Sequence, residues 1–264
     1  MTLHDSFRKS GNFLFKYRGQ IPLFIFILGV PVLIFTNHPL YEALANGSIG
    51  VAFKTTILIA SVLVSLLGFI IRAYTIATTP RGTSGRNTKK QVAEQLNTKG
   101  IYSMVRHPLY LGNYLMWAGL LLFTMNPFLI LMVSFLFWLY YERIMFAEEA
   151  YLESRFGQQF IDWADRVPPF IPAFGKFEKG NIPFSFKAVL RREYTGLFAI
   201  TLVYTMIDYI IHFTIRFLYQ NDVFSVSDCL RPSLYCLLVV LVITLILRTL
   251  KHYTKVLNPE VNRD

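Results

Sequence analysis

Charged residues are scarce in this chain of 264 residues: they make up 16% of it, whereas an average soluble protein carries roughly 25%. Hydrophobic residues amount to 54%, and the mean hydropathy is +0.43. Intrinsic disorder is excluded, because a disordered chain is poor in the apolar residues that dominate here. The two cysteines, Cys229 and Cys236, form no spacing typical of a zinc, haem or iron–sulfur site. The composition therefore predicts an integral membrane protein without a bound metal.

Six apolar segments are close to the ~20 residues that an α-helix needs to cross a bilayer. They are residues 21–35, 55–77, 109–125, 127–141, 195–219 and 234–250. The turn pair Asn126-Pro127 predicts a tight hairpin between the third and fourth segments. We therefore expect an all-α, polytopic helical membrane protein with about six transmembrane helices. Residues 1–172 would form its core, and residues 173–264 a C-terminal extension of two membrane helices.

The formal net charge of +10 would indicate a nucleic-acid partner in a soluble protein. Here the basic residues instead follow the predicted spans. All but Lys54, Arg216 and Arg231 fall in the two terminal tails and the two long polar loops, which six spans place on one side. An excess of Lys and Arg marks the cytoplasmic side of a membrane protein. The charge therefore predicts cytoplasmic termini, a lipid bilayer as the surroundings and no nucleic-acid partner.

The first polar loop ends in Arg106-His107-Pro108, where the third predicted span begins. Pro108 suits the first turn of a helix. His107 and Tyr110 are three residues apart, so both side chains face the same part of the membrane–water boundary. Gly112 would let a flat ligand or another backbone approach closely. From these residues alone, His107 is also explained as a helix-capping or interface histidine.

Glu148 and Glu149 adjoin the end of the fourth predicted span. Carboxylates close to hydrocarbon need a cationic partner, which the sequence offers in Arg143 or Arg106, or in a bound cation. Apolar residues at irregular helical spacing between 144 and 163 predict an amphipathic helix on the cytoplasmic membrane surface. The basic run 81–90 is explained either as a solvated, headgroup-binding loop or as part of a site.

Three ordered blocks resemble the isoprenylcysteine carboxyl methyltransferase family, whose architecture phospholipid N-methyltransferases share. The blocks are Gly100-Ile101-Tyr102, Arg106-His107-Pro108-Leu109-Tyr110-Leu111-Gly112, and Glu148-Glu149 followed by Val167-Pro168 and Ile171-Pro172. These proteins are integral-membrane enzymes that use S-adenosylmethionine. The resemblance implies that region 1–172 is a methyltransferase core.

The resemblance also implies roles for individual residues. The implied cofactor-binding residues are Gly100, Ile101, Tyr102, His107, Pro108, Tyr110, Gly112, Glu148 and Glu149. A sulfonium and an ammonium suit a carboxylate pair and aromatic faces. His107 and Arg106 are the expected catalytic residues: His107 would orient the cofactor or the acceptor, and Arg106 or Arg86 would hold an acceptor anion. An anionic oxygen needs no general base, whereas an amine acceptor would need His107 or a glutamate as one.

The implied acceptor depends on a departure from the family pattern. In prenylcysteine enzymes an arginine four residues before the first glutamate contacts the substrate carboxylate. This chain has Ile144 there, and Arg143 beside it is rotated by about 100° around a helix. Residues 84–98 resemble instead the bacterial branch that methylates the 1-phosphate of Kdo2-lipid A.

Arg81, Arg86, Lys89 and Lys90 would fit a phosphorylated acceptor. We therefore expect O-methylation of an anionic lipid phosphate in a bacterial inner membrane, with Arg86 and Arg143 as candidate substrate contacts. The alternatives are an isoprenylcysteine carboxylate or a phospholipid amine. A sterol-reductase-type oxidoreductase using NADPH also fits the Arg-His-x-x-Tyr-x-Gly block, although such enzymes usually have Asp where this chain has Asn113.

The fifth predicted span carries Asp208, His212 and Arg216 at helical spacing on one face. Ionisable residues inside a membrane are costly and usually face the bundle interior. Two interpretations remain open: an ion-pair ladder that fixes the helix, or a polar path or headgroup site. A transporter is disfavoured because the sequence shows no inverted repeat.

Overall fold

The computed structural model describes residues 2–80, 93–220 and 223–258. In this part of the chain the regular structure is helical and no β-strand occurs, which confirms the all-α prediction. The α-helices are α1 (Leu3–Tyr17), α2 (Ile21–Phe35), α3 (His38–Ala45), α4 (Val51–Ala77), α5 (Pro108–Thr124), α6 (Pro127–Phe156), α7 (Gln158–Ala164), α8 (Phe186–Thr214) and α9 (Pro232–Tyr253). Four short helical turns are also present in the described residues: η1 (Ile101–Ser103), η2 (Phe174–Lys176), η3 (Ile215–Tyr219, a π-turn) and η4 (Val226–Cys229).

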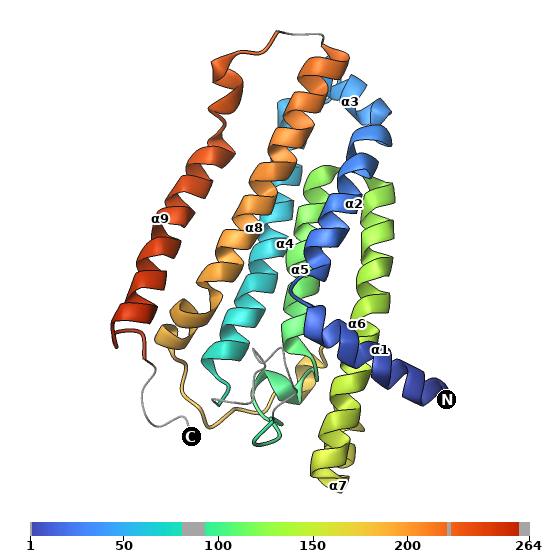
Figure 1. The fold of residues 1–264 in the computed structure, drawn as a ribbon, viewed down its shortest axis with the longest axis vertical. Coiled ribbons are helices and arrows are strands. Elements are labelled where there is room, and N and C mark those ends of the chain that lie inside the picture. Colours follow the sequence, from blue (N-terminus) through green and yellow to red (C-terminus); the bar gives the residue numbers. More distant parts are fainter. Residues whose placement is uncertain (1, 81–92, 221–222, 259–264) are drawn as a thin grey trace.

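The long helices run side by side along the longest axis of the molecule (Figure 1). Four are long and apolar enough to span a membrane: α4, α6, α8 with η3, and α9. A fifth span is possible if α1 and α2, which meet at 84°, count as one broken helix. The prediction of about six spans is therefore not confirmed. The reason is length: the 17 residues of α5 extend about 25 Å, short of the ~30 Å of hydrocarbon.

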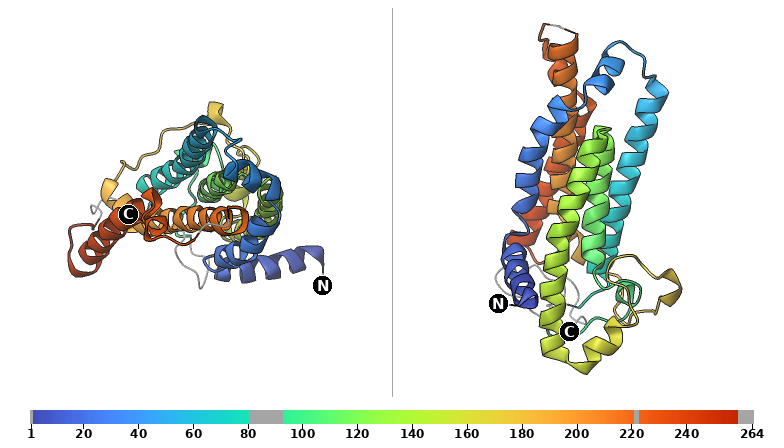
Figure 2. Two further views of the ribbon diagram at one scale, coloured as in Figure 1. Left: turned by 90° about the horizontal axis from the view of Figure 1, so that it is seen from above. Right: turned by 90° about the vertical axis from the view of Figure 1, so that its right-hand side faces the viewer.

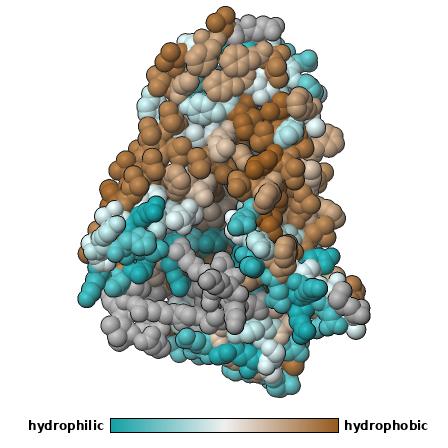
Figure 3. All heavy atoms as spheres, in the orientation of Figure 1, coloured by the Kyte–Doolittle hydropathy of each residue, from teal (hydrophilic) through white to brown (hydrophobic). Residues whose placement is uncertain are grey.

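The start of α1, the loop after residue 93, the loop 165–185 and the end of α9 lie at the same end of the bundle (Figures 1 and 2). We call this the polar end. Figure 3 shows that hydrophilic side chains gather there, whereas the rest of the visible face is largely hydrophobic. This arrangement agrees with the shared side that the basic residues predict.

The structure differs from the sequence prediction where the fourth span ends. α6 continues straight to Phe156, so the predicted surface helix over 144–163 is instead the projecting end of α6 followed by α7. Gly157, with φ of +54°, separates the two helices. The helix that lies across the polar end is α1, which the sequence analysis missed. A capping box of Thr2 and Asp5 starts it, and Gly11 lets it touch the backbone of α6.

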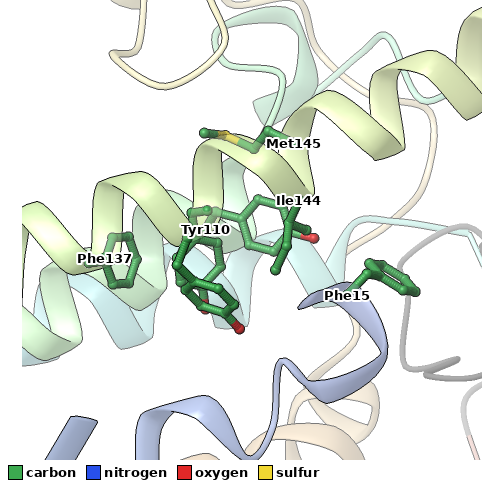
Figure 4. Packing of buried hydrophobic residues seen from close by; sticks show 7 residues of the cluster. Phe15, Tyr110, Phe137, Ile144 and Met145 are labelled. Atoms are coloured by element: carbon green, nitrogen blue, oxygen red, sulfur yellow. The ribbon is translucent and has the colours of Figure 1, made fainter. Parts of the chain in front are cut away.

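Small residues bring α4 and α5 into close contact. A Cβ atom on Gly112 would lie 2.8 Å from the carbonyl oxygen of Gly68, and one on Gly119 would lie 2.4 Å from that of Ser61. Such small-residue contacts are typical of helix pairs in membranes. Near the polar end, Phe15 and Tyr110 pack with Phe137, Ile144 and Met145 of α6 (Figure 4). This cluster fixes α1 and α5 against α6 beside the candidate site.

Candidate functional site

A cavity of about 370 Å³ lies at the polar end of the bundle, within the ~300–1,000 Å³ range of small-molecule sites. Its lining comes from the α1–α2 junction, α4, residues 93–102, the start of α5, the middle and end of α6, α7 and the start of α8. Figure 3 shows a recess where the hydrophobic surface gives way to the hydrophilic one. The cavity thus lies near the level at which the apolar surface of the bundle meets its polar end.

One wall of the cavity is a cluster of His107 with two carboxylates. His107 Nε2 lies 2.8 Å from Glu149 Oε1, and His107 Nδ1 lies 3.7 Å from Glu148 Oε2. Arg106 also donates to Glu149, over 3.2 Å. Backbone bonds hold this cluster in place, because the amides of Arg106 and His107 donate to the carbonyls of Pro168 and Pro169. The two polar loops are therefore joined behind the site.

The charges of this cluster reinforce one another. Burial alone would lower the pKa of His107, but its close contacts with Glu148 and Glu149 and their negative charges raise it above its usual value. The two carboxylates therefore favour the protonated imidazole, which is poorly suited to accept a further proton. The buried Nε of Arg106 has no hydrogen-bond partner among the described residues, so a donor is left for a ligand acceptor.

Aromatic side chains form the adjacent walls. Tyr110 stacks on His107 with ring centroids 5.6 Å apart. A hydrogen bond of 3.0 Å from the indole N–H of Trp163 to the backbone carbonyl of Tyr102 holds Tyr102 in place. Burial and the neighbouring Glu148 raise the pKa of Tyr102, so it stays a neutral phenol. The wall therefore combines carboxylates with aromatic faces.

A second polar group lies deeper in the bundle. Arg72 of α4 donates to both oxygens of Glu193 of α8, at 2.9 and 2.8 Å, and to Asn113 Oδ1 at 2.6 Å. The amide of Asn113 in turn donates to the hydroxyl of Tyr141, at 3.0 Å. All four side chains line the cavity. The cavity therefore extends from the His107 cluster to a buried ion pair.

The structure places the sequence-predicted site residues at different distances from the cavity. The residues that line it are Tyr102, Arg106, His107, Pro108, Tyr110, Glu148 and Glu149. Gly100, with φ of +64°, donates its amide to Glu178 at the back of the loop, and Ile101 is buried beside it. Gly112 was expected to let either a flat ligand or another backbone approach closely. In the structure it is the backbone of α4 that does so.

Of the two predicted substrate contacts, Arg143 does not line the cavity, and Arg86 stays a prediction. Arg143 lies over the ring of Phe7 at 4.4 Å and donates to Ser10 Oγ at 3.4 Å, so it ties α6 to α1 rather than pairing with the glutamates. Arg106 is the cation that pairs with Glu149. Arg86 lies outside the described residues, as does the rest of the basic run 81–90.

Several charged and polar residues that line the cavity were not predicted as site residues, among them Arg72, Asn113, Arg192 and Glu193. Arg72 was counted with the polar loop, although it lies inside α4, five residues before the end of that helix. That single cation in an apolar run was the available signal, because intramembrane charges usually mark a site or a paired contact. Glu193 gave no signal of its own, since its partner is 121 positions away.

The polar face of α8 has its partners near the opposite end of the helix. Asp208 accepts two bonds from Arg231, at 2.7 and 2.6 Å, and one from Ser233. His212 lies 3.0 Å from Asp228, whose pKa is lowered first by the backbone amide of Ser225 and then by His212. These contacts join α8 to the segment that leads into α9. Of the two interpretations of this face, they favour the ion-pair ladder that fixes the helix over a polar path or headgroup site.

Comparison with known proteins finds a family model that matches the part of the chain around the site. Residues 56–159 match the phospholipid methyltransferase model, and this range holds most of α4, all of α5 and α6, His107 and both glutamates, but not Glu193. Protein-S-isoprenylcysteine O-methyltransferase B of Arabidopsis thaliana is 34% identical over 110 residues, covering 40% of this chain and 55% of that protein. The enzyme of Schizosaccharomyces pombe is 31% identical over 114 residues, covering 41% and 48%.

A third relative has another name. The nickel-cobalt-cadmium resistance protein NccN of Alcaligenes xylosoxydans xylosoxydans is 37% identical over 83 residues, covering 31% of this chain and 38% of that protein. No solved structure matches. The chain spans about half the length of the curated isoprenylcysteine enzymes above. The resemblance carried by the three sequence blocks is confirmed: residues 56–159 match the phospholipid methyltransferase model, and the chain is similar to isoprenylcysteine O-methyltransferases.

Proposed function

We propose that the chain is an integral-membrane methyltransferase that uses S-adenosylmethionine and methylates a membrane-embedded acceptor. The observation that carries this proposal is the cluster of His107, Glu148 and Glu149 beside aromatic walls, in a cavity at the membrane boundary and inside the family-matched segment. A cavity there is open to a water-soluble donor, while the acceptor arrives from the bilayer. The proposed location is a bacterial inner membrane, with the polar end in the cytoplasm.

The residues present fit this donor. Its ammonium and sulfonium are cations, which Glu148 and Glu149 and the faces of Tyr102 and Tyr110 can hold. Its carboxylate needs a donor, and the buried Nε of Arg106 is available. Gly100 and Ile101 shape the loop behind Tyr102, and Pro108 starts the helix that carries Tyr110. S-adenosylmethionine would supply an activated methyl group on sulfur.

The residues of the chain would act by alignment rather than by proton transfer. Methyl transfer is an in-line displacement in which the C–S bond breaks as the C–O bond forms and sulfur keeps the bonding pair. An anionic acceptor oxygen releases no proton, so the protonated His107 need not act as a base. Its role would be to hold the two carboxylates in position. The surrounding apolar cluster of α1, α5 and α6 would exclude water.

We propose an anionic lipid phosphate, of the lipid A type, as the acceptor. Support comes from arginines that line the cavity from four elements: Arg18, Arg72, Arg106 and Arg192. An isoprenylcysteine carboxylate, the substrate that the relatives' names indicate, is the second candidate acceptor. Against this candidate, the position at which prenylcysteine enzymes have an arginine is Ile144 in this chain. Ile144 is fully buried in the apolar cluster and cannot pair with a carboxylate.

A phospholipid amine is the third candidate acceptor, and it predicts a different pH dependence. An amine has to lose a proton before or during transfer, so turnover would still rise above about pH 8. An anionic oxygen is already deprotonated there, so turnover would be level. This difference separates the amine from both oxygen acceptors without knowledge of the acceptor's identity.

Mass spectrometry of lipid extracts from cells with and without the gene tests the proposal. We expect one lipid or lipidated peptide to be heavier by one methylene only when the gene is present. The double variant Glu148→Gln, Glu149→Gln should abolish that species, because it removes the carboxylates and leaves the fold's apolar contacts. An extract in which neither lipids nor prenylated proteins change would refute both oxygen-acceptor candidates.

A further inference from the structure

We propose that Arg72 binds the anionic head group of the lipid acceptor, and that Glu193 is the positioning residue that presents it. This inference rests on the proposed methyltransferase function. It assigns the acceptor end of the cavity to the buried ion pair and not to the His107 cluster. It also gives α8, which lies outside the family-matched segment, a part in the site.

Four helices converge on the Arg72 guanidinium. α4 carries Arg72 itself, α8 provides Glu193, α5 provides Asn113, and α6 provides Tyr141 at the end of the chain of hydrogen bonds. Glu193 is 2% exposed, and both of its oxygens accept from the guanidinium. A bidentate pair of this kind fixes the plane of the guanidinium. The cation therefore has one orientation relative to the cavity.

The fixed guanidinium retains donors for a ligand. Arginine has five N–H groups, and Arg72 uses three of them on Glu193 and Asn113. Within residues 2–80, 93–220 and 223–258, the other two N–H groups, one on each terminal nitrogen, have no partner. The Arg72 side chain is 20% exposed and lines the cavity, unlike its buried partner. Guanidinium N–H groups of this kind can donate to phosphate or carboxylate oxygens.

Depth in the membrane separates this group from the donor-binding cluster. Tyr141 and Glu148 are seven residues apart on α6, which corresponds to about 10 Å along the helix. Asn113 is likewise six residues beyond His107 on α5, or about 9 Å. Glu148 and Glu149 therefore lie at a first level of the cavity, near the polar end. Arg72 lies at a second level, closer to the bilayer centre. A donor from the aqueous side would occupy the first level, and a lipid head group would reach the second.

Stability alone does not explain the ion pair. A buried pair is often matched or exceeded in stability by apolar side chains of similar volume, which would be simpler to place in a membrane helix. Ionisable groups inside a membrane usually mark a functional site. Four arginines and three glutamates line the cavity, and His107 adds a cation, so the lining favours an anion as the second ligand.

Methyl-transfer kinetics of the purified full chain in lipid–detergent micelles test the inference. The donor is S-adenosylmethionine with a labelled methyl group, and the acceptors are lipid A, N-acetyl-S-farnesylcysteine and phosphatidylethanolamine. The key variant is Arg72→Gln with Glu193→Gln, which removes both charges together and leaves neither one unpaired. The control is Arg191→Gln, which removes a charge from the same helix outside the cavity lining.

We expect the double variant to bind S-adenosylmethionine as the wild type does, while its kcat/KM for the acceptor falls about 10- to 100-fold, mainly through KM. Glu193→Gln alone should show a smaller fall. A purely structural pair predicts the opposite order: the single variant is impaired and the double variant regains wild-type kcat/KM. An impaired single variant with a rescued double variant would overturn the inference. So would a wild-type protein that methylates phosphatidylethanolamine and neither of the other two acceptors.

Arg72→Lys provides a second route if the double variant does not fold. Lysine keeps the charge opposite Glu193 but cannot form the planar fork, so we expect normal donor binding and a raised acceptor KM. An unchanged KM would overturn the inference. Failure of the proposed function looks different, because the wild-type protein would then transfer no labelled methyl to any of the three acceptors.

Discussion

Replacing Gly112 by alanine should disturb both the packing of α4 on α5 and the acceptor end of the cavity. The new Cβ would lie 2.6 Å from Arg72 Cγ and 2.8 Å from the carbonyl oxygen of Gly68. Favourable contacts between carbon atoms lie near 3.5–4.0 Å, so the first contact is about 1 Å too short. The Arg72 side chain can move, but the Gly68 oxygen belongs to the backbone. The two helices would therefore have to separate.

Overpacking of a well-packed interior typically costs about 1–3 kcal/mol. For a chain of this size such a loss corresponds to a fall in Tm of about 2–10 °C. The Arg72 guanidinium would also shift relative to Asn113, so acceptor turnover should fall more than donor binding. Thermal unfolding in detergent measures the first effect, and kinetics with labelled S-adenosylmethionine measure the second.

Gly29→Ala is the matched control for this variant. It also adds a methyl group to a buried helical glycine, but its Cβ would meet only the end of the Leu129 side chain, at 3.4 Å. We expect its Tm to change by less than about 2 °C, because the helix propensity of alanine offsets a mild contact. Equal Tm values and equal turnover for Gly112→Ala and wild type would refute the assignment of this glycine to close helix packing.

Three further predictions concern the charged groups. Asp208→Asn should lower Tm by a few degrees through loss of the Arg231 pair, with donor binding and turnover unchanged; impaired turnover at normal stability would instead favour a polar site on α8. Because the pKa of His107 is raised on folding, its protonation stabilises the fold fully below about pH 6.5, and this contribution is lost as the pH rises through the folded pKa. The fall of Tm with pH should therefore be smaller in His107→Gln, and identical slopes would contradict that origin. Glu149→Gln should weaken S-adenosylmethionine binding about 10- to 100-fold in calorimetry, since a charge-assisted contact is lost, and an unchanged Kd would remove this residue from the donor site.

The apolar segments and the charge distribution were sufficient to predict the all-α class, the apolar helices α2, α4, α5, α6, α8 and α9, and their shared polar end, but not α1 or the number of spans. His107, Tyr110, Glu148 and Glu149, which the sequence grouped as candidate cofactor contacts, line one cavity, and their role in binding stays a prediction. These features depend on local periodicity and on hydrophobicity, which a sequence displays directly.

The missed features depend on contacts between distant parts of the chain. Arg72 pairs with Glu193, and the sequence around either residue gives no indication of the other. Arg143 looked suited to the glutamates because it is near them in sequence, but α1 lies across the polar end and takes its side chain. The amphipathic segment after residue 144 is not interrupted by a helix breaker before Gly157, so it continues α6 instead of turning onto the membrane surface. The division at residue 172 stays a prediction.

The donor site is the central claim, and binding of S-adenosylmethionine to the purified protein tests it most directly. Isothermal titration calorimetry should show one site per chain that is weakened by Glu148→Gln and by Glu149→Gln, with no binding of NADPH. Binding of NADPH without S-adenosylmethionine would favour the reductase alternative. Absence of S-adenosylmethionine binding, or affinity that both glutamate variants leave unchanged, would contradict the account.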